Sequence, residues 1–265
     1  MTAAPSQEVL DAFGAGRSSE PLPGGEGLAF RVGEIVLKRV HDPAEAEWVQ
    51  SLLSGIEQNG FRVPAPMTTR AGGWLHDGWS ASRFIEDLRP AAPRWYDIAR
   101  WGLQFGDAAQ QARPPDTDAL RRRTHRWAVA DRVAWGETAK DLAPPAEEAR
   151  QALTALLIPG RSSGDHLVHG DLSGNVFVDP SGVPVVLDVS PYLRDRRWAM
   201  AIVVADAVLW NGADLAIARR FAQESDDRDL LGRALIFRLV AEQLADEPRH
   251  GAMLEPYRRV HRALI

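Results

Sequence analysis

Residues 165–190 constrain the fold more than any other stretch of this sequence. They contain two apolar runs, 176–178 and 183–189, with Asp179-Pro180-Ser181-Gly182 between them. Pro and Gly with Asp and Ser between two β-rich runs are typical of a hairpin turn. The hairpin is predicted to place Asn175, at the start of one strand, beside Asp188, near the end of the other.

Polar side chains gather at one end of this predicted hairpin. His169-Gly170-Asp171 lies directly upstream of the first strand, so Asp171, Asn175 and Asp188 are all delivered to the same region. Carboxylate and amide oxygens that converge in this way suit a hard cation such as magnesium, with one carboxylate left to act as a base. His169 is interpreted as a structural residue that holds the loop by a hydrogen bond.

The order HGDLSGN followed by VVLDVS resembles the catalytic and metal-binding loops of aminoglycoside phosphotransferases and related small-molecule kinases. The resemblance implies that Asp171 is the catalytic base and that Asn175 and Asp188 hold magnesium on the phosphates of ATP. The family usually has one more residue between the Asp and the Asn. Because a one-residue slip turns a strand side chain to the opposite face, Gly174 is expected to absorb the difference through unusual backbone angles.

Composition narrows the class of protein. A chain of 265 residues with 45% hydrophobic residues can bury one substantial core or two smaller lobes. There is no cysteine, no apolar run long enough to span a bilayer and no pattern of a signal peptide, so we expect a cytoplasmic protein without disulfides or membrane contact. The net charge of −5 argues against nucleic-acid binding, and no protein partner is evident.

Lysine is rare in this chain and therefore informative. Lys38 and Lys140 are the two lysines among 31 basic residues, and Lys38 lies in a strand-like run where a phosphate-binding kinase lysine is expected. Upstream, the turn that contains Gly24, Gly25 and Gly27 has two interpretations. It is either a flap whose backbone amides approach the nucleotide phosphates or a simple hairpin turn.

A helix is predicted to begin at Asp42-Pro43, with Asp42 as its N-cap and Pro43 in the first helical position. Glu45 falls in the apolar stripe of this helix, and a carboxylate on a buried face needs a partner. The favoured hypothesis pairs Glu45 with Lys38, as in the lysine–glutamate pair of kinases. The alternative is a capping box in which Glu45 satisfies a backbone amide.

Further elements are predicted from the pattern of apolar residues and breakers. Residues 67–70 and 74–85 are expected to form a strand pair joined by Ala71-Gly72-Gly73. Helices are expected over roughly 93–112 and 117–136, with Pro114-Pro115 between them.

The resemblance extends over most of the chain and implies an α+β, two-lobed, protein-kinase-like fold. Residues 1–88 would form a small nucleotide-binding lobe with an antiparallel sheet and one helix, and residues 89–265 a mostly helical lobe for catalysis and acceptor binding. The backbone near Phe84 and Ile85 would hydrogen-bond adenine at the hinge, and the nucleotide would lie between the lobes. A protein kinase is disfavoured because there is no A-P-E element and no long activation segment after Asp188.

The predicted activity is ATP- and magnesium-dependent phosphoryl transfer to a hydroxyl of a small molecule. The acceptor is left open as a sugar, a nucleoside, an aminoglycoside-like compound or another metabolite. Residues 90–265 carry 23 basic and 24 acidic residues, a balance that does not favour a polycationic acceptor, although Glu224, Asp226 and Asp227 form a local acidic cluster. The alternative function is a nucleotide-binding regulator without transferase activity, motivated by the shortened loop.

Overall fold

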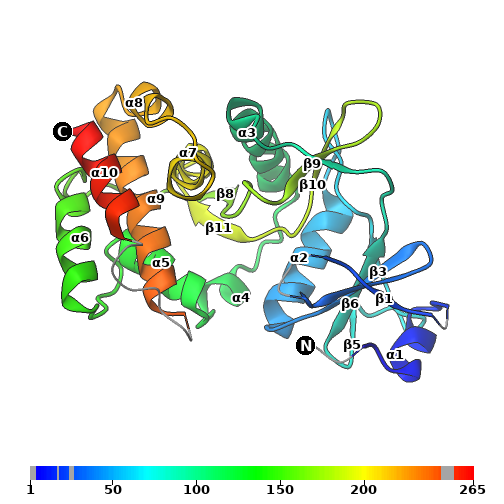
Figure 1. The fold of residues 1–265 in the computed structure, drawn as a ribbon. Coiled ribbons are helices and arrows are strands. Elements are labelled where there is room, and N and C mark those ends of the chain that lie inside the picture. The colour runs from blue at the N-terminus through cyan, green and yellow to red at the C-terminus, as the bar shows by residue number, and fades with distance from the viewer. Residues whose placement is uncertain (1–3, 17, 24–26, 246–253) are drawn as a thin grey trace. The chain divides into compact units, whose positions relative to one another are not determined.

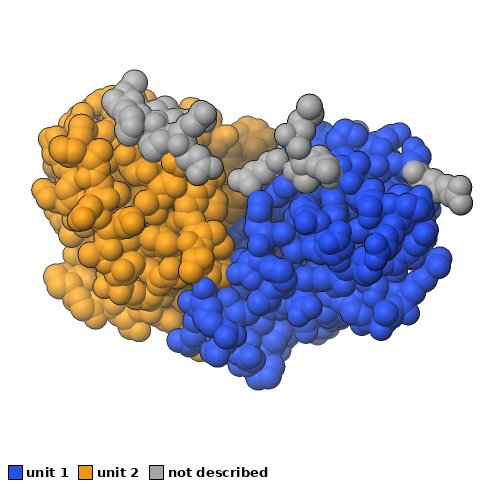
Figure 2. Space-filling view, turned by 90° about the horizontal axis from the view of Figure 1, so that it is seen from below, with its two compact units in different colours: residues 1–91, 107–122, 175–191 blue, residues 92–106, 123–174, 192–265 orange. Residues whose placement is uncertain are grey.

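The structure is a computed structural model that describes residues 4–16, 18–23, 27–245 and 254–265 (Figure 1). The chain divides into two compact units (Figure 2). Unit 1 comprises residues 1–91, 107–122 and 175–191, and unit 2 comprises residues 92–106, 123–174 and 192–265. Each unit therefore combines segments that are far apart in the sequence. The functional division at residue 88 stays a prediction.

Unit 1 is built on an antiparallel sheet. Its strands follow the order β1 (Glu20–Pro21), β2 (Ala29–Val32), β3 (Ile35–Arg39), β6 (Trp79–Arg83) and β4 (Pro66–Met67), and β5 (Leu75–His76) also pairs with β6. Helix α1 (Gln7–Ala12) adds Val9 and Leu10 to the core of this sheet, which also contains Phe30 and Trp79. The rings of Phe30 and Trp79 meet edge to face at 5.8 Å, a favoured aromatic geometry.

Helix α2 (Pro43–Gly55) begins as predicted. The Asp42 carboxylate accepts hydrogen bonds from the backbone N–H groups of Ala44 and Glu45, at 3.0 and 3.2 Å, and Pro43 occupies the first turn. These bonds satisfy backbone donors that would otherwise lack a partner at the start of the helix. Trp48 and Leu52 form its buried stripe.

One predicted strand is wrong in its extent. The sequence pattern favoured a continuous strand from Trp74 to Ile85, whereas the structure has β5 and β6 with a reversal at Asp77-Gly78. Both turn residues have positive φ, 45° and 72°. Asp-Gly at such positions is the strong signal of a two-residue hairpin, and it outweighs the strand propensity on either side.

The hairpin predicted at residues 176–189 forms in unit 1. β9 (Val176–Val178) pairs antiparallel with β10 (Pro184–Val186), and β7 (Arg89–Pro90) adds to the other edge of β9. The Asp179 carboxylate holds the turn, because Oδ1 accepts hydrogen bonds from the backbone N–H groups of Ser181 and Val183 and from the Ser181 hydroxyl. The second strand is shorter than the predicted run of 183–189.

Unit 2 is mostly helical. Its core helix is α9 (Ser225–Gln243), which packs against α5 (Arg126–Ala134), α6 (Pro144–Thr154) and α7 (Trp198–Trp210) (Figure 1). Its other elements are α8 (Ala216–Phe221), α10 (Glu255–Leu264) and the strand pair β8 (His166–His169) and β11 (Pro191–Arg194). Aromatic rings of Tyr192, Trp198 and Phe237 meet in its core at 5.3 to 5.8 Å.

One long helix is shared between the two units, and one predicted helix is divided in two. Helix α3 (Trp95–Ala112) forms as predicted, and its first part belongs to unit 2 while its last turns belong to unit 1. The helix predicted at 117–136 is divided into α4 (Asp118–Arg121) and α5, because His125 caps the start of α5 by accepting a hydrogen bond from the N–H of Ala128.

Among the described residues, no helix is both long enough and apolar enough to cross a membrane. The predicted α+β class is confirmed.

Candidate active site

Lys38 and Asp188 form an ion pair in unit 1. Lys38 lies on β3, the strand between β2 and β6. Because side chains alternate along a strand, Ile35 and Leu37 enter the core while Lys38 projects from the opposite face. Its ammonium group contacts a carboxylate oxygen of Asp188, and both side chains remain about two-fifths exposed, at 38% and 37%. A lysine and an aspartate that are 150 residues apart in the sequence are thus brought together at the surface of unit 1.

The hairpin register places Asn175 beside Asp188, as predicted. Val176 pairs with Val186, and the backbone carbonyl of Asn175 accepts a hydrogen bond from the N–H of Leu187 at 2.8 Å. Asp188 follows directly and has a φ of 45°, in a left-handed region that aspartate and asparagine tolerate better than most residues. The backbone turn therefore redirects the Asp188 side chain at the end of the ladder.

Asp171 lies in unit 2 on a loop that is fixed at several points. The buried His169 ring accepts a hydrogen bond at Nδ1 from the backbone N–H of Asp171, at 3.0 Å, so the predicted structural role of His169 is confirmed. Leu172 is fully buried and packs against Gly102 of α3, so closely that a Cβ at position 102 would overlap Leu172 Cδ1. A Cβ at Gly174 would meet nothing within contact distance, and Gly174 has no positive φ, so a left-handed conformation does not absorb the missing residue.

A buried charge pair contacts the same loop and was not found by sequence analysis. Arg238 of α9 donates to both carboxylate oxygens of Asp206 of α7, each at 2.7 Å, and its Nη2 also donates to Asp171 Oδ1 at 3.0 Å. The hydroxyl of Ser173 donates to Asp206 Oδ2 at 2.9 Å. The available signal was Asp206, the charged residue of an otherwise apolar helix, which requires a partner when the helix is buried.

Burial and the charge of the partner act in opposite directions on the pKa values of this pair. Burial alone would lower the pKa of the Arg238 guanidinium, but the Asp206 carboxylate outweighs burial and raises that pKa above its usual value. Burial also raises the pKa of the Asp206 carboxyl, and Arg238 opposes that rise. A bidentate contact between a guanidinium and a carboxylate is the strongest form of such a pair.

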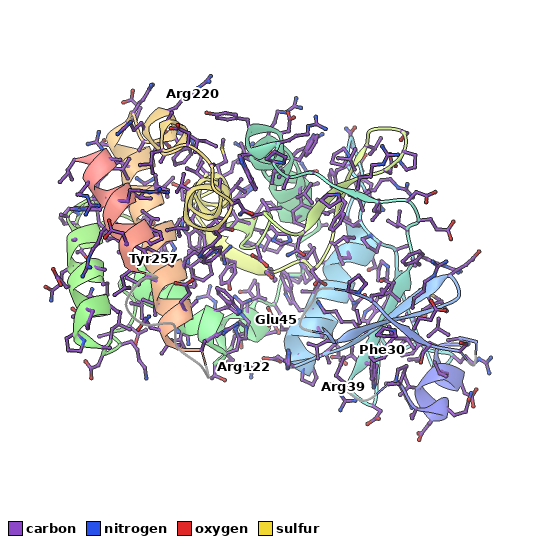
Figure 3. The ribbon with its side chains drawn as sticks, in the orientation of Figure 1. Phe30, Arg39, Glu45, Arg122, Arg220 and Tyr257 are labelled. Carbon is purple, nitrogen blue, oxygen red and sulfur yellow. The ribbon has the colours of Figure 1, made fainter. Side chains whose placement is uncertain are left out.

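The predicted nucleotide-binding residues also include three glycines and Glu45. Gly24 and Gly25 lie outside the described residues, and Gly27 has a φ of 72°. The described ion pair of Lys38 is with Asp188, while Glu45 lies in the first turn of α2 (Figure 3). A contact of Glu45 with Lys38 or with a nucleotide therefore stays a prediction.

The predicted hinge is an extension of β6. The backbone N–H of Phe84 donates to the carbonyl of Glu34 at 2.9 Å and continues the ladder between β3 and β6. The guanidinium of Arg31 stacks on the Phe84 ring at 3.9 Å and donates to Glu86 at 2.9 Å. The N–H of Phe84 is thus engaged within the sheet, and adenine binding by Phe84 or Ile85 stays a prediction.

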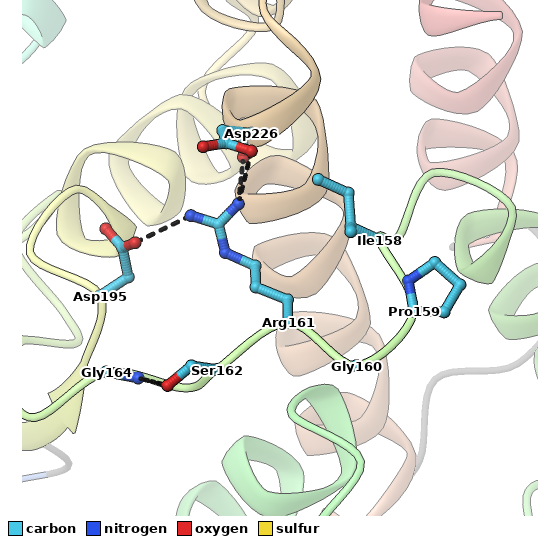
Figure 4. A pocket seen from close by; sticks show the side chains of 8 residues that line it. All are labelled: Ile158, Pro159, Gly160, Arg161, Ser162, Gly164, Asp195 and Asp226. Atoms are coloured by element: carbon cyan, nitrogen blue, oxygen red, sulfur yellow. Dashed lines mark hydrogen bonds and ion pairs between the residues drawn. The ribbon is translucent and has the colours of Figure 1, made fainter.

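A separate pocket in unit 2 is lined by none of the predicted site residues. Arg161 lines it and contacts Asp195 at 2.8 Å and Asp226 at 3.2 Å (Figure 4). The same guanidinium also contacts Asp229 at 3.3 Å. Because three carboxylates already surround this guanidinium, we interpret the cluster as a cross-link between the loop at Arg161 and the start of α9.

Comparison with solved structures identifies the fold. No model of a protein family matches the sequence, and no curated protein matches it. An aminoglycoside phosphotransferase from Alicyclobacillus acidocaldarius superposes with a TM-score of 0.60 at 14% identity, over 100% of this chain and 95% of that chain. A thermostable mutant of aminoglycoside phosphotransferase APH(4)-Ia, in a ternary complex with ADP and hygromycin B, gives 0.56 at 14% identity, over 97% of each chain.

The choline kinase LicA from Streptococcus pneumoniae gives a TM-score of 0.52 at 13% identity, over 94% of this chain and 93% of that chain. This chain has the fold of the aminoglycoside phosphotransferase-like kinases. The resemblance predicted from HGDLSGN and VVLDVS is confirmed at the level of the fold. Since identity is low throughout, the roles of individual residues depend on the geometry of this chain.

Proposed function

We propose that this protein is a phosphotransferase that moves the γ-phosphoryl group of ATP to a hydroxyl of a small molecule. The observation that carries the proposal is the contact of Lys38 with Asp188, next to Asn175 on the hairpin. A strand lysine, a metal-binding asparagine and a metal-binding aspartate are the recurring parts of kinase-like sites. Asp171 provides the fourth part, a half-exposed carboxylate on the loop just before Asn175.

The side chains at the end of the hairpin fit magnesium. Asn175 and Asp188 offer the hard oxygen ligands that this ion prefers, and magnesium commonly takes one or two protein ligands and completes its shell with water and phosphate oxygens. The described residues contain no group of three His, Asp or Glu side chains suited to hold a metal without such help. Magnesium at this position would neutralise charge on the phosphates, and Lys38 would bind the same phosphates after leaving Asp188.

Asp171 is assigned to the acceptor hydroxyl. Its side chain is 51% exposed, and its Oδ1 accepts a hydrogen bond from Arg238. The carboxylate would accept a hydrogen bond from the hydroxyl and take its proton as the bond from the hydroxyl oxygen to the γ-phosphorus forms and the bond from that phosphorus to ADP breaks. In a loose transition state the main contribution of such a residue is orientation.

The charges of unit 2 favour an acceptor that is not a polycation. Asp226 contacts Arg161 at 3.2 Å and Asp227 contacts Arg197 at 2.7 Å, so most of the acidic cluster near α9 is neutralised within the protein. A sugar, a nucleoside or another neutral metabolite fits better than an aminoglycoside. We place the reaction in the cytoplasm, where ATP is supplied.

The test is a screen of metabolite and antibiotic pools for an ATP-dependent mass gain of one phosphate, followed by Asp171→Asn. This change keeps the shape of the side chain and removes its basicity. We expect turnover to fall by about 10²–10⁴-fold, with ATP affinity little altered. Asp141→Asn, at an exposed position outside the site, is the matched control and should keep full activity.

Three outcomes oppose the proposal in different ways. Unchanged turnover in Asp171→Asn would remove the base assignment. Loss of ATP binding in the same variant would make Asp171 a structural or metal-binding residue. A wild-type protein that binds MgATP and transfers no phosphate would instead be a nucleotide-binding regulator.

A further inference from the structure

Arg238 and Asp206 form one of the most deeply buried charge pairs in unit 2. Their side chains are 1% and 2% exposed. The guanidinium lies 5.3 Å from the ring centres of both Trp127 and Trp210 and 5.0 Å from that of Phe237. Aromatic faces stabilise a cation at this range, so the arginine is held by two carboxylates and by rings around it.

The pair binds the loop 171–173 at both of its ends. Arg238 Nη2 donates to Asp171 Oδ1 at 3.0 Å, and the Ser173 hydroxyl donates to Asp206 Oδ2 at 2.9 Å. The two helices that carry the pair, α7 and α9, pack against each other. Asp171 is therefore connected through one guanidinium to the interior of unit 2.

Packing of α7 on α9 does not by itself explain a charge pair at this position. Both helices are buried along most of their length, and most of their own buried side chains are apolar. Replacing a buried ion pair by apolar residues of similar size is often neutral or stabilising, because two charges no longer lose their hydration. Apolar residues would not reproduce the hydrogen bonds of the pair with the half-exposed carboxylate of Asp171 and with the hydroxyl of Ser173.

We propose that Asp206 and Arg238 are positioning residues that set the orientation of the Asp171 carboxylate for phosphoryl transfer. The inference rests on the proposed function. The same contacts would restrict the conformations of the short loop, Leu172 to Gly174, between Asp171 and Asn175. Within unit 2, Ser173 is hydrogen-bonded to Asp206 and Leu172 packs against Gly102 of α3.

The experiment compares two charge-free double variants. Asp206→Leu/Arg238→Met removes the proposed pair without leaving an isolated buried charge, so the protein should fold. Asp131→Leu/Arg194→Met is the matched control. It removes a second buried pair of unit 2, whose bidentate hydrogen bonds are 2.9 and 2.6 Å long and whose side chains are each 8% exposed.

Hydrogen exchange is the first readout because it needs no acceptor. We expect backbone amides of residues 170–174 to exchange about tenfold faster in Asp206→Leu/Arg238→Met and at the wild-type rate in the control, since local opening is governed by local contacts. The second readout is turnover with the acceptor from the screen. It should fall by about 10²-fold in the first double variant, the effect of a small misplacement of a reacting group, while KM for ATP is unchanged.

Arg238→Lys adds a conservative comparison. Lysine keeps the buried charge beside Asp206 but lacks the planar fork that reaches two carboxylates at once, so turnover should lie between that of the wild type and of the double variant. The proposal is overturned if exchange at 170–174 or turnover stays at the wild-type level in Asp206→Leu/Arg238→Met. It is also overturned if the control double variant loses turnover equally. A wild-type protein without transferase activity would refute the proposed function, while the exchange comparison still decides whether the pair holds the loop.

Discussion

Gly102 lies in the middle of α3, where alanine would ordinarily stabilise a helix by about 1 kcal/mol relative to glycine. The structure explains why glycine is present. A Cβ at this position would overlap Cδ1 of Leu172, which is fully buried next to Asp171. The close approach of helix and loop thus depends on the missing side chain.

We expect Gly102→Ala to destabilise the protein by about 1–3 kcal/mol, because an overpacked core must shift the buried Leu172. Gly174→Ala is the comparison, since position 174 has open space and no positive φ; it should change the free energy of unfolding by less than about 0.5 kcal/mol. Urea denaturation of the two variants measures the difference. Equal stabilities would show that Leu172 repacks without cost.

Residues of the candidate site could be predicted where the pattern is local. Asp171, Asn175 and Asp188 lie within 18 positions, and the hairpin between them has clear turn chemistry. Arg238 could not be found in this way, because its partners Asp206 and Asp171 are 32 and 67 residues away. The sequence shows that a buried charge needs a partner, but tertiary packing of α7 and α9 determines which one it meets.

At the scale of elements, residues with a distinct role in a cap or a turn determine where helices begin and strands end. Asp42-Pro43 predicted the start of α2 correctly because the cap and the first helical residue each have a distinct local role. The strand at 74–85 was wrong because Asp77-Gly78 carries a reversal inside an otherwise strand-like run. Pairing of β4 and β5 with different parts of β6 depends on contacts that no local pattern contains.

The turn between β9 and β10 gives a prediction with a pH dependence. Hydrogen bonds from Ser181, then from Val183 and Arg62, lower the pKa of the Asp179 carboxyl to about 2. A carboxyl whose pKa is lower in the folded state stabilises the fold above its unfolded pKa of about 4, and this contribution is lost as the pH falls through 2.

We therefore expect Asp179→Ala to be less stable than the wild type at pH 7, with a difference that narrows between pH 4 and pH 2. Urea denaturation at several pH values measures it. A difference that is the same at every pH would mean that the ionised carboxylate does not stabilise this turn.

At the scale of the whole molecule, the candidate residues are divided between the two compact units. Lys38, Asn175 and Asp188 belong to unit 1, and Asp171 belongs to unit 2. The unit boundary falls after Gly174, inside the motif that the sequence shows as one local pattern. We therefore expect substitutions of the candidate residues in unit 1 to weaken ligand binding, and substitution of Asp171 in unit 2 to lower turnover.

The last prediction is that MgATP stabilises the protein through the residues of unit 1. At a concentration a hundredfold above its dissociation constant, a ligand that binds the folded state adds about 2.7 kcal/mol. For a chain of this size, each kcal/mol raises the melting temperature by roughly 2–4 °C. Asp188→Asn should abolish the magnesium-dependent part of the shift, because asparagine tolerates the positive φ but lacks the charge. Thermal unfolding with ATP and magnesium, with ATP and a chelator, and with magnesium alone separates the contributions. A well-folded sample that shows no shift with millimolar MgATP would refute nucleotide binding, and an equal shift in Asp188→Asn would move the metal site away from the hairpin.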